Sequence, residues 1–203
     1  LKDEGYNVSL QGLFAAQTLR AIAEITTPSD NYSTVRTRPY ELVQVTDRAK
    51  LPAAAEDAYP LTMLQGGMLF HSEYSPDSGI YHDIFSFHVR YDLDVGHFVA
   101  ALRELVELHP VLRTYFDLAT FSQPLQIVLR DVAAPLQVDD LRGGSEEEQR
   151  QLLSSWLEEE RQRRFEWRQA PLFRLQIHQR SGRSFQLTLS FHHAILDGWS
   201  VAT

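Results

Sequence analysis

Two adjacent histidines and an aspartate near the C-terminal end are the residues best suited to do chemistry. His192 and His193 occur in the segment SFHHAILDGWS, and Asp197 and Gly198 follow them closely. An imidazole has an ordinary pKa of about 6.5, so it can accept and release a proton near neutral pH. The segment therefore predicts a histidine base. Asp197 would hold the turn through an arginine or a backbone amide, and Gly198 would allow a backbone conformation or a close approach that other residues do not.

A predicted strand before this segment indicates which histidine faces the interior. Apolar residues occupy every second position from Phe185 to Phe191, which is typical of a half-buried strand. If the alternation continues, His193 follows the apolar face and His192 the polar face. We therefore predict that His193 lies in the interior beside a cleft.

Other interpretations of the same residues stay open from the spacing alone. A histidine pair at a strand end with an aspartate nearby is most often structural or exposed. These side chains are also allowed metal ligands, but adjacent strand histidines diverge and no cysteine is present, so we predict no metal. A serine–histidine–aspartate triad has no support, because the sequence lacks a G-x-S-x-G element.

The elements that must position these residues alternate between helices and strands. Capping boxes beginning at Thr62 and Ser145 predict two helices, and Asp94 predicts a third, which Pro110 limits. Strands are predicted near 85–91, 125–129, 135–138, 173–177 and 185–191. The last two are joined by a turn at Ser181-Gly182 and form a hairpin. The pattern predicts an α/β (α+β) fold with mixed strand pairing.

Composition excludes several kinds of protein. Among 203 residues, 27 are acidic and 19 basic, a net charge of −8 that does not suit a general nucleic-acid binder. The absence of cysteine excludes disulfides and thiolate nucleophiles, so any thioester chemistry must use a sulfur from outside this chain. No apolar run approaches the ~18 residues of a membrane span, and no signal peptide is recognisable. We expect a cytoplasmic location and no nucleic-acid or membrane partner.

The composition changes along the chain in a way that predicts three parts. Residues 1–25 fit one or two short helices that are too small to form a core alone. Residues 26–56 begin as a polar linker with prolines and continue as an ordered lead-in, and 57–203 form one alternating pattern. The first residue is not Met, and the last follows a turn without a closing signal, so we expect a fragment of a longer protein.

The segment HHAILDGWS resembles the HHxxxDG signature of condensation domains from nonribosomal peptide synthetases, and more widely of chloramphenicol-acetyltransferase-like acyl transferases. Three further segments resemble motifs of the same family, in the same order. They are YPLTMLQGGMLFH (Tyr59–His71), HPVLRTYF (His109–Phe116) and RRFEWRQAPLFRL (Arg163–Leu175). Pro110 and Glu166 depart from the residues most frequent there. Ordered matches over most of the chain make coincidence improbable.

The resemblance implies a chloramphenicol-acetyltransferase-like lobe with a mixed sheet flanked by helices. Residues 57–203 would form the N-terminal lobe of a condensation domain, with the C-terminal lobe outside this sequence. Residues 1–25 resemble the last helices of a peptidyl carrier domain. The serine that carries phosphopantetheine belongs to a G-G-x-S motif that this sequence lacks, so no serine here is expected to carry the arm.

By resemblance, the reaction is amide bond formation between a donor thioester and an acceptor aminoacyl thioester, both on 4′-phosphopantetheine arms. The implied partners are donor and acceptor carrier domains and an adjacent adenylation domain, in antibiotic or siderophore biosynthesis. The fragment alone would be inactive. His193 would position the amine or accept its proton, with His192 as a structural neighbour. Asp197 would order the motif through a salt bridge. Gly198 would let a backbone amide face the thioester oxygen or let the arm pass closely, and Arg113 is a candidate stabiliser of the motif.

The resemblance leaves other members of the superfamily open. Heterocyclisation domains replace the histidine pair with an aspartate-rich motif that this chain lacks. Epimerisation domains share HHxxxDG but usually have a different first motif. Noncatalytic recruitment domains usually lose the second histidine or the glycine, whereas His193 and Gly198 are both present. The first motif also resembles domains that take a D-configured donor, but a carrier tail precedes it here, so the configuration of the donor stays open.

Overall fold

The computed structural model of the protein describes residues 6–16, 18–28, 37–75 and 78–202. The chain divides into two units, Leu1–Arg38 and Pro39–Thr203. The described residues of the first unit contain two helices and a short antiparallel strand pair. These are α1 (Leu10–Ala15), α2 (Leu19–Ile25), β1 (Tyr6–Asn7) and β2 (Thr27–Pro28). One or two short helices are expected in this segment, and that prediction is confirmed.

The second unit alternates helices and strands. Its helical elements are α3 (Val45–Arg48), α4 (Met63–Tyr74), α5 (Val95–Leu108), the 3₁₀ turn η1 (Pro110–Arg113), α6 (Glu146–Gln162) and α7 (Gly198–Ala202). Its strands are β3 (Ala55–Pro60), β4 (His82–Val89), β5 (Thr114–Asp117), β6 (Leu125–Leu129), β7 (Leu136–Asp140), β8 (Phe173–Ser181) and β9 (Ser184–His192). The predicted α/β (α+β) fold class is confirmed.

Local sequence signals set the starts of the three long helices. Thr62 and Ser145 each accept a hydrogen bond from the backbone N–H three residues later, and the side chain at that later position bonds back to the cap. Asp94 accepts a hydrogen bond from the backbone N–H of His97 and so caps α5. All three predicted helix starts are confirmed.

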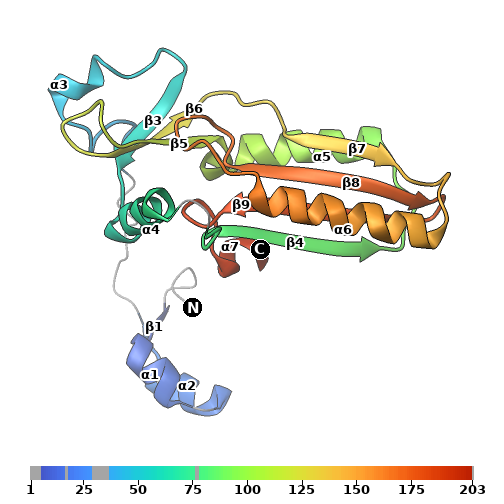
Figure 1. Cartoon of the computed structure of the whole chain (residues 1–203). Coiled ribbons are helices and arrows are strands. Elements are labelled where there is room, and N and C mark those ends of the chain that lie inside the picture. The colour runs from blue at the N-terminus through green and yellow to red at the C-terminus, as the bar shows by residue number, and fades with distance from the viewer. Residues whose placement is uncertain (1–5, 17, 29–36, 76–77, 203) are drawn as a thin grey trace. The chain divides into compact units, whose positions relative to one another are not determined.

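Two sheets organise the second unit (Figure 1). The larger has the strand order β4-β9-β8-β7, and the smaller has the order β3-β6-β5. The pairing of β7 with β8 is parallel and the other pairs are antiparallel, so the predicted mixed pairing is confirmed. Helix α6 lies on one face of the larger sheet and α5 lies on the other (Figure 1).

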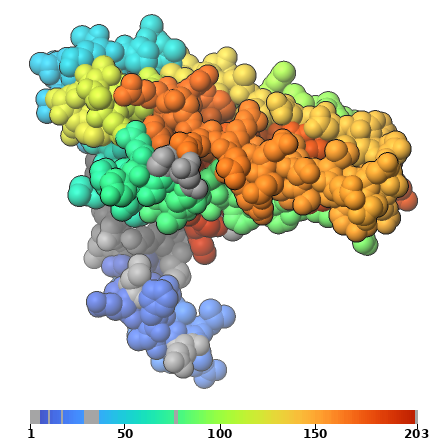
Figure 2. All heavy atoms as spheres, viewed as in Figure 1, coloured from blue at the N-terminus to red at the C-terminus, as the bar shows by residue number. Residues whose placement is uncertain are grey.

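Both faces of the larger sheet are covered. Odd-numbered residues of β9 such as Phe191 join the hydrophobic core together with residues of α5. Even-numbered residues such as Thr188 and Ser190 are polar, yet they are buried too. Ser190 Oγ donates to Glu160 Oε1 of α6 at 2.5 Å, and Figure 2 shows α6 (orange) covering this side of the sheet. The predicted half-buried strand is therefore wrong in one respect, because α6 buries its polar face.

Arg113 has a role away from the histidine segment. Its side chain is buried where η1, α5 and β6 meet. Its guanidinium donates to the backbone carbonyls of Val106, at 3.0 Å, and Leu129, and it pairs with Glu56 at 2.5 Å. Arg113 therefore ties the end of α5 to the smaller sheet, and the idea that it stabilises the histidine motif is wrong.

Candidate functional site

The two histidines lie where β9 ends, beside the start of β4. The two strands are antiparallel, and His82 lies opposite His192 in their register. The hydrogen-bond ladder extends one residue further, because the backbone N–H of His193 donates to the carbonyl oxygen of Tyr81 at 2.8 Å. Strand pairing rather than a free loop therefore holds both histidines in place.

His192 is the buried member of the pair, with an exposed fraction of 3%. Its Nδ1 accepts a hydrogen bond from the backbone N–H of Ala194 at 3.1 Å, so the proton of the neutral ring lies on Nε2, 3.2 Å from Ser72 Oγ. Burial, followed by the charges of His82 and His193, lowers the pKa of His192 to about 4. A neutral ring with both nitrogens engaged does not suit a proton acceptor, and this geometry fits a structural neighbour.

His193 has the geometry of a base. Its side chain is 34% exposed, and its Nδ1 lies 2.6 Å from Asp83 Oδ2 on β4. An ionised carboxylate can only accept a hydrogen bond, so Nδ1 of the neutral ring carries the proton and Nε2 keeps its lone pair. His193 therefore offers a proton-accepting nitrogen from a half-exposed position.

The faces predicted for the two histidines agree with the strand alternation, but the burial predicted for them is wrong. The alternation places His193 in the interior and His192 on the polar face, whereas in the structure His192 is the more buried residue. The physical reason is that the polar face of β9 is itself covered. The Trp167 ring stands edge-on to the His192 ring, with 5.0 Å between the ring centroids. His193 lies outside the part of the strand that is covered in this way, and its ring is partly exposed.

Asp197 and Gly198 open helix α7. Asp197 Oδ1 accepts hydrogen bonds from the backbone N–H and the Oγ of Ser200, at 2.8 and 2.7 Å, and these bonds lower the pKa of Asp197. Among the described residues, Asp197 forms hydrogen bonds and no ion pair, so the expected salt bridge is not found there. Gly198 has no positive φ, and a Cβ atom there would meet nothing within 4 Å. The predicted special backbone conformation at Gly198 is therefore wrong.

Asp83 is the member of this site that sequence reasoning misses. It lies 110 residues before its partner His193. The sequence does hold one signal, because Asp83 continues the alternation of Phe85 and Phe87 and so puts a charge on an otherwise apolar strand face. Pairing of this strand with the histidine strand brings the two residues together.

A further network lies under the site, on the face that α6 covers. Glu160 is buried, with 3% of its side chain exposed, and its Oε1 accepts a hydrogen bond from Arg174 Nε at 2.7 Å. His82 Nε2 lies 3.8 Å from the same oxygen, and burial is the main cause that lowers the pKa of His82. This network holds β8, β9 and α6 together next to His192.

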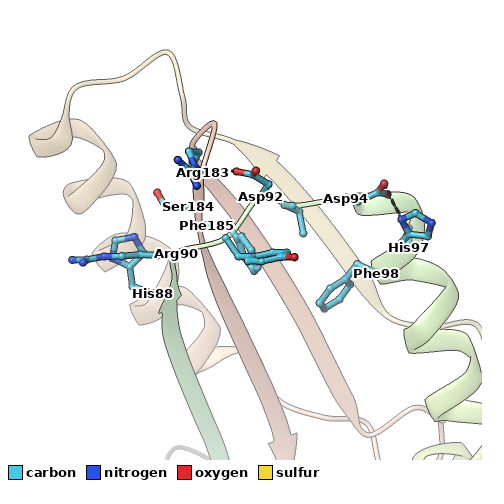
Figure 3. A pocket seen from close by; sticks show the side chains of 11 residues that line it. His88, Arg90, Asp92, Asp94, His97, Phe98, Arg183, Ser184 and Phe185 are labelled. Carbon is cyan, nitrogen blue, oxygen red and sulfur yellow. Dashed lines mark hydrogen bonds and ion pairs between the residues drawn. The ribbon is translucent and has the colours of Figure 1, made fainter.

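A wide hollow lies at the opposite end of β9, at the hairpin turn (Figure 3). Its lining includes Asp92, Asp94, His97 and Arg183. Asp92 pairs with Arg183 at 3.5 Å, and Asp94 pairs with His97 at 2.9 Å, as Figure 3 shows for the second pair. The four side chains are mostly exposed. The charges here neutralise one another in water, and we place no site in this hollow.

In the part of the chain that the structure describes, no three histidine, aspartate or glutamate residues are grouped so that they could hold a metal ion. Within those same residues, no helix has the length and apolar character needed to cross a membrane.

Comparisons with known proteins give a consistent result. The family model described as Condensation domain matches residues 55–203. The chain is 36% identical to the AMB antimetabolite synthetase AmbE of Pseudomonas aeruginosa in an alignment 209 positions long, which covers 98% of this chain and 10% of that protein. It is 42% identical to a linear gramicidin synthase of Brevibacillus parabrevis over 147 residues, which are 72% of this chain and 3% of that protein. The chain thus spans a tenth or less of the length of these relatives.

Solved structures share the fold of the second unit. The first condensation domain of the calcium-dependent antibiotic synthetase, in complex with a substrate analogue, matches with a TM-score of 0.64 at 18% identity, covering 73% of this chain and 36% of that chain. The starter condensation domain of rhizomide synthetase matches with a TM-score of 0.62 at 21% identity, covering 71% of this chain and 36% of that chain. The family model covers well over half of the sequence, and the resemblance seen in the motifs is thereby confirmed: the chain belongs to the condensation-domain family of nonribosomal peptide synthetases.

Proposed function

We propose that residues 57–203 form the N-terminal lobe of a domain that makes an amide bond between two carrier-bound substrates. The amine of the acceptor aminoacyl thioester attacks the carbonyl carbon of the donor thioester. The new C–N bond forms, the C–S bond breaks, and the thiolate leaves on the donor arm. The 4′-phosphopantetheine arms belong to the carrier domains and reach this chain as parts of the substrates.

The observation that carries this proposal is the hydrogen bond between His193 and Asp83. Its Nδ1 faces Asp83 at 2.6 Å, which leaves the lone pair of Nε2 for a ligand. Nε2 accepts a hydrogen bond from the attacking amine and takes its proton as the C–N bond forms. The same proton then passes to the leaving thiolate. A thioester is already activated, so much of the rate comes from holding amine and carbonyl together, a contribution of about 7–11 kcal/mol in well-oriented reactions.

The other residues of the motif support this one. His192 stays neutral and packs against Trp167, which keeps the end of β9 in place. Asp197 fixes the start of α7 by capping it, and Gly198 leaves space beside the helix start for the arm to pass. We also propose that residues 1–25 are the end of a carrier domain. The partners are then the donor and acceptor carriers and an adenylation domain.

The test uses the complete synthetase with both carriers loaded. Amide formation is measured in a single turnover for the wild type, His193→Ala and His97→Ala. We expect His193→Ala to slow the step by about 10²–10⁴-fold, the usual contribution of a general base. His97→Ala is the matched control, because it also removes a histidine from an aspartate pair, but at the other end of the sheet. It is expected to react at the wild-type rate.

Two outcomes would contradict the proposal. Wild-type turnover in His193→Ala would remove this residue from the mechanism and favour a noncatalytic recruitment domain. Inversion of the carrier-bound residue without amide formation, detected by chiral analysis of the released amino acid, would identify an epimerisation domain instead.

A further inference from the structure

We infer that Asp83 is a positioning residue for the reaction and that it acts through His193. This inference rests on the proposed function of His193. Asp83 Oδ2 lies 2.6 Å from His193 Nδ1, and about a third of each side chain is exposed. Among the described residues, His193 is the hydrogen-bond partner of the Asp83 carboxylate.

The backbone builds this pair, so its geometry does not depend on two free side chains meeting. In the antiparallel ladder of β4 and β9, Asp83 lies opposite Phe191. His193 is two residues further along, and residues in this diagonal relation share a face of the sheet within reach of long side chains. The hydrogen bond from the His193 N–H to the Tyr81 carbonyl holds the histidine in line with β4. The carboxylate is therefore in place before a substrate arrives.

The position of Asp83 has two chemical consequences for the His193 ring. A neutral imidazole has one N–H, and a carboxylate beside Nδ1 selects the tautomer whose lone pair lies on Nε2. The hydrogen bond also fixes the rotation of the ring, so that the lone pair keeps one direction. When Nε2 accepts the proton of the amine, the negative charge of Asp83 stabilises the imidazolium that forms.

Burial separates this pair from an ordinary surface ion pair. Ion pairs between fully exposed side chains gain little, because water screens the charges and two mobile side chains must be ordered. The Asp83 and His193 side chains are two-thirds covered. Next to them, His192 is buried with a lowered pKa, and His82 opposite it is held beside Glu160. The carboxylate therefore acts on the ring across a short distance that little water enters.

A double-mutant cycle in the complete synthetase tests the inference. Single-turnover amide formation from loaded carriers is measured for the wild type, Asp83→Ala, His193→Ala and the double variant. We expect Asp83→Ala to lower kcat by about tenfold or more, but by no more than the about 10²–10⁴-fold loss expected for His193→Ala, with KM for the loaded carriers unchanged. Because Asp83 acts through the ring, the double variant should be no slower than His193→Ala alone.

Further variants separate positioning from folding. Asp83→Asn keeps the shape of the side chain, but its NH2 group can donate to Nδ1 and hold the ring in the tautomer without a lone pair on Nε2, so this variant should fold and still react well below the wild-type rate. It also keeps the test decisive if Asp83→Ala does not fold. Asp92→Ala is the matched control, since it removes an exposed aspartate that follows β4, and it should react like the wild type.

Three results would overturn the inference. They are a wild-type rate in Asp83→Ala, a double variant that shows the product of the two single losses, and a wild-type rate in Asp83→Asn. In each of them a slow His193→Ala variant leaves the proposed function standing. A wild-type rate in His193→Ala would remove the proposed function and this inference together, so the two failures are distinguishable.

Discussion

The two ends of the larger sheet each carry an aspartate–histidine pair, and the pairs differ in how they are built. At the end of β9, Asp83 lies in β4 and His193 directly follows β9; the two side chains lie 2.6 Å apart and are 35% and 34% exposed. At the hairpin end, Asp94 and His97 come from one helix start, lie 2.9 Å apart and are 61% and 91% exposed. The residue types and the distances are nearly the same, whereas the surroundings are not.

This difference shows that burial by neighbouring groups, more than residue type, distinguishes the Asp83–His193 pair from the exposed Asp94–His97 pair. At the hairpin end the aspartate caps its own helix, because Asp94 accepts a hydrogen bond from the backbone N–H of His97. At the end of β9 Asp83 hydrogen-bonds to His193, which is 110 residues away in the sequence, and the buried His192 lies beside the pair. If this contrast is correct, substitutions at the β9 end should have large effects and substitutions at the hairpin end small ones.

The largest effect on stability is expected at Glu160, beneath the β9 end. Its buried carboxylate accepts hydrogen bonds from Arg174 and from Ser190. Glu160→Ala leaves the Arg174 guanidinium without its carboxylate, and removing one partner of a buried pair costs about 3–5 kcal/mol. The free energy of unfolding, measured by urea titration with tryptophan fluorescence, should fall by this amount.

The matched control for this experiment is Glu158→Ala on the same helix. Glu158 pairs with Arg161 at 3.0 Å, but both side chains are more than 60% exposed. Its loss should change the free energy of unfolding by less than about 0.5 kcal/mol. Equal losses for Glu158→Ala and Glu160→Ala would show that burial does not decide how much a charged pair contributes to stability. The contrast between the two ends of the sheet would then be wrong.

The next effect is a loss of stability in acid that originates at His192. Its pKa of about 4 in the folded protein lies below the ordinary value of 6.5, so between these values the unfolded chain binds the proton more strongly. The stability contributed by the neutral ring is complete above about pH 6.5 and declines as the pH falls to about 4, by about 3 kcal/mol in total.

Urea midpoints between pH 7 and pH 4 measure this decline. In His192→Asn the amide oxygen can take the place of Nδ1 as the acceptor for the Ala194 N–H, while the titrating ring is gone. The variant should therefore lose less stability than the wild type across this pH range, and His97→Ala should follow the wild type. A His192→Asn curve parallel to that of the wild type would contradict the prediction.

Much of the fold follows from local signals in the sequence. The caps at Thr62, Asp94 and Ser145 bond to the backbone three residues later, so they need no knowledge of distant parts of the chain. Strand Leu125–Leu129 also forms over the predicted residues. The sequence does not predict strand Ala55–Pro60, because this segment has little alternation of its own and is ordered by pairing with β6.

The site is predicted less completely, because its geometry depends on distant contacts. The motif points to His192 and His193, but which of them is buried depends on α6 and Trp167, and these cover a face that the alternation alone marks as exposed. Asp83 is 110 residues away from His193, so spacing within the motif does not reveal it. Periodicity describes a strand, whereas burial of that strand is decided by its neighbours.

The smallest effect is expected at the hairpin end, where the same two residue types can be removed one at a time. Asp94→Ala removes the cap of α5 and should lower Tm by about 2–4 °C, as the loss of a helix cap does in a domain of this size. Asp94→Asn should restore most of this loss, because asparagine also accepts the hydrogen bond from the backbone. His97→Ala should leave Tm nearly unchanged, because its exposed ion pair contributes little. A larger fall in Tm for His97→Ala than for Asp94→Ala would mean that the exposed ion pair itself is stabilising. Burial would then not explain the difference between the two ends of the sheet.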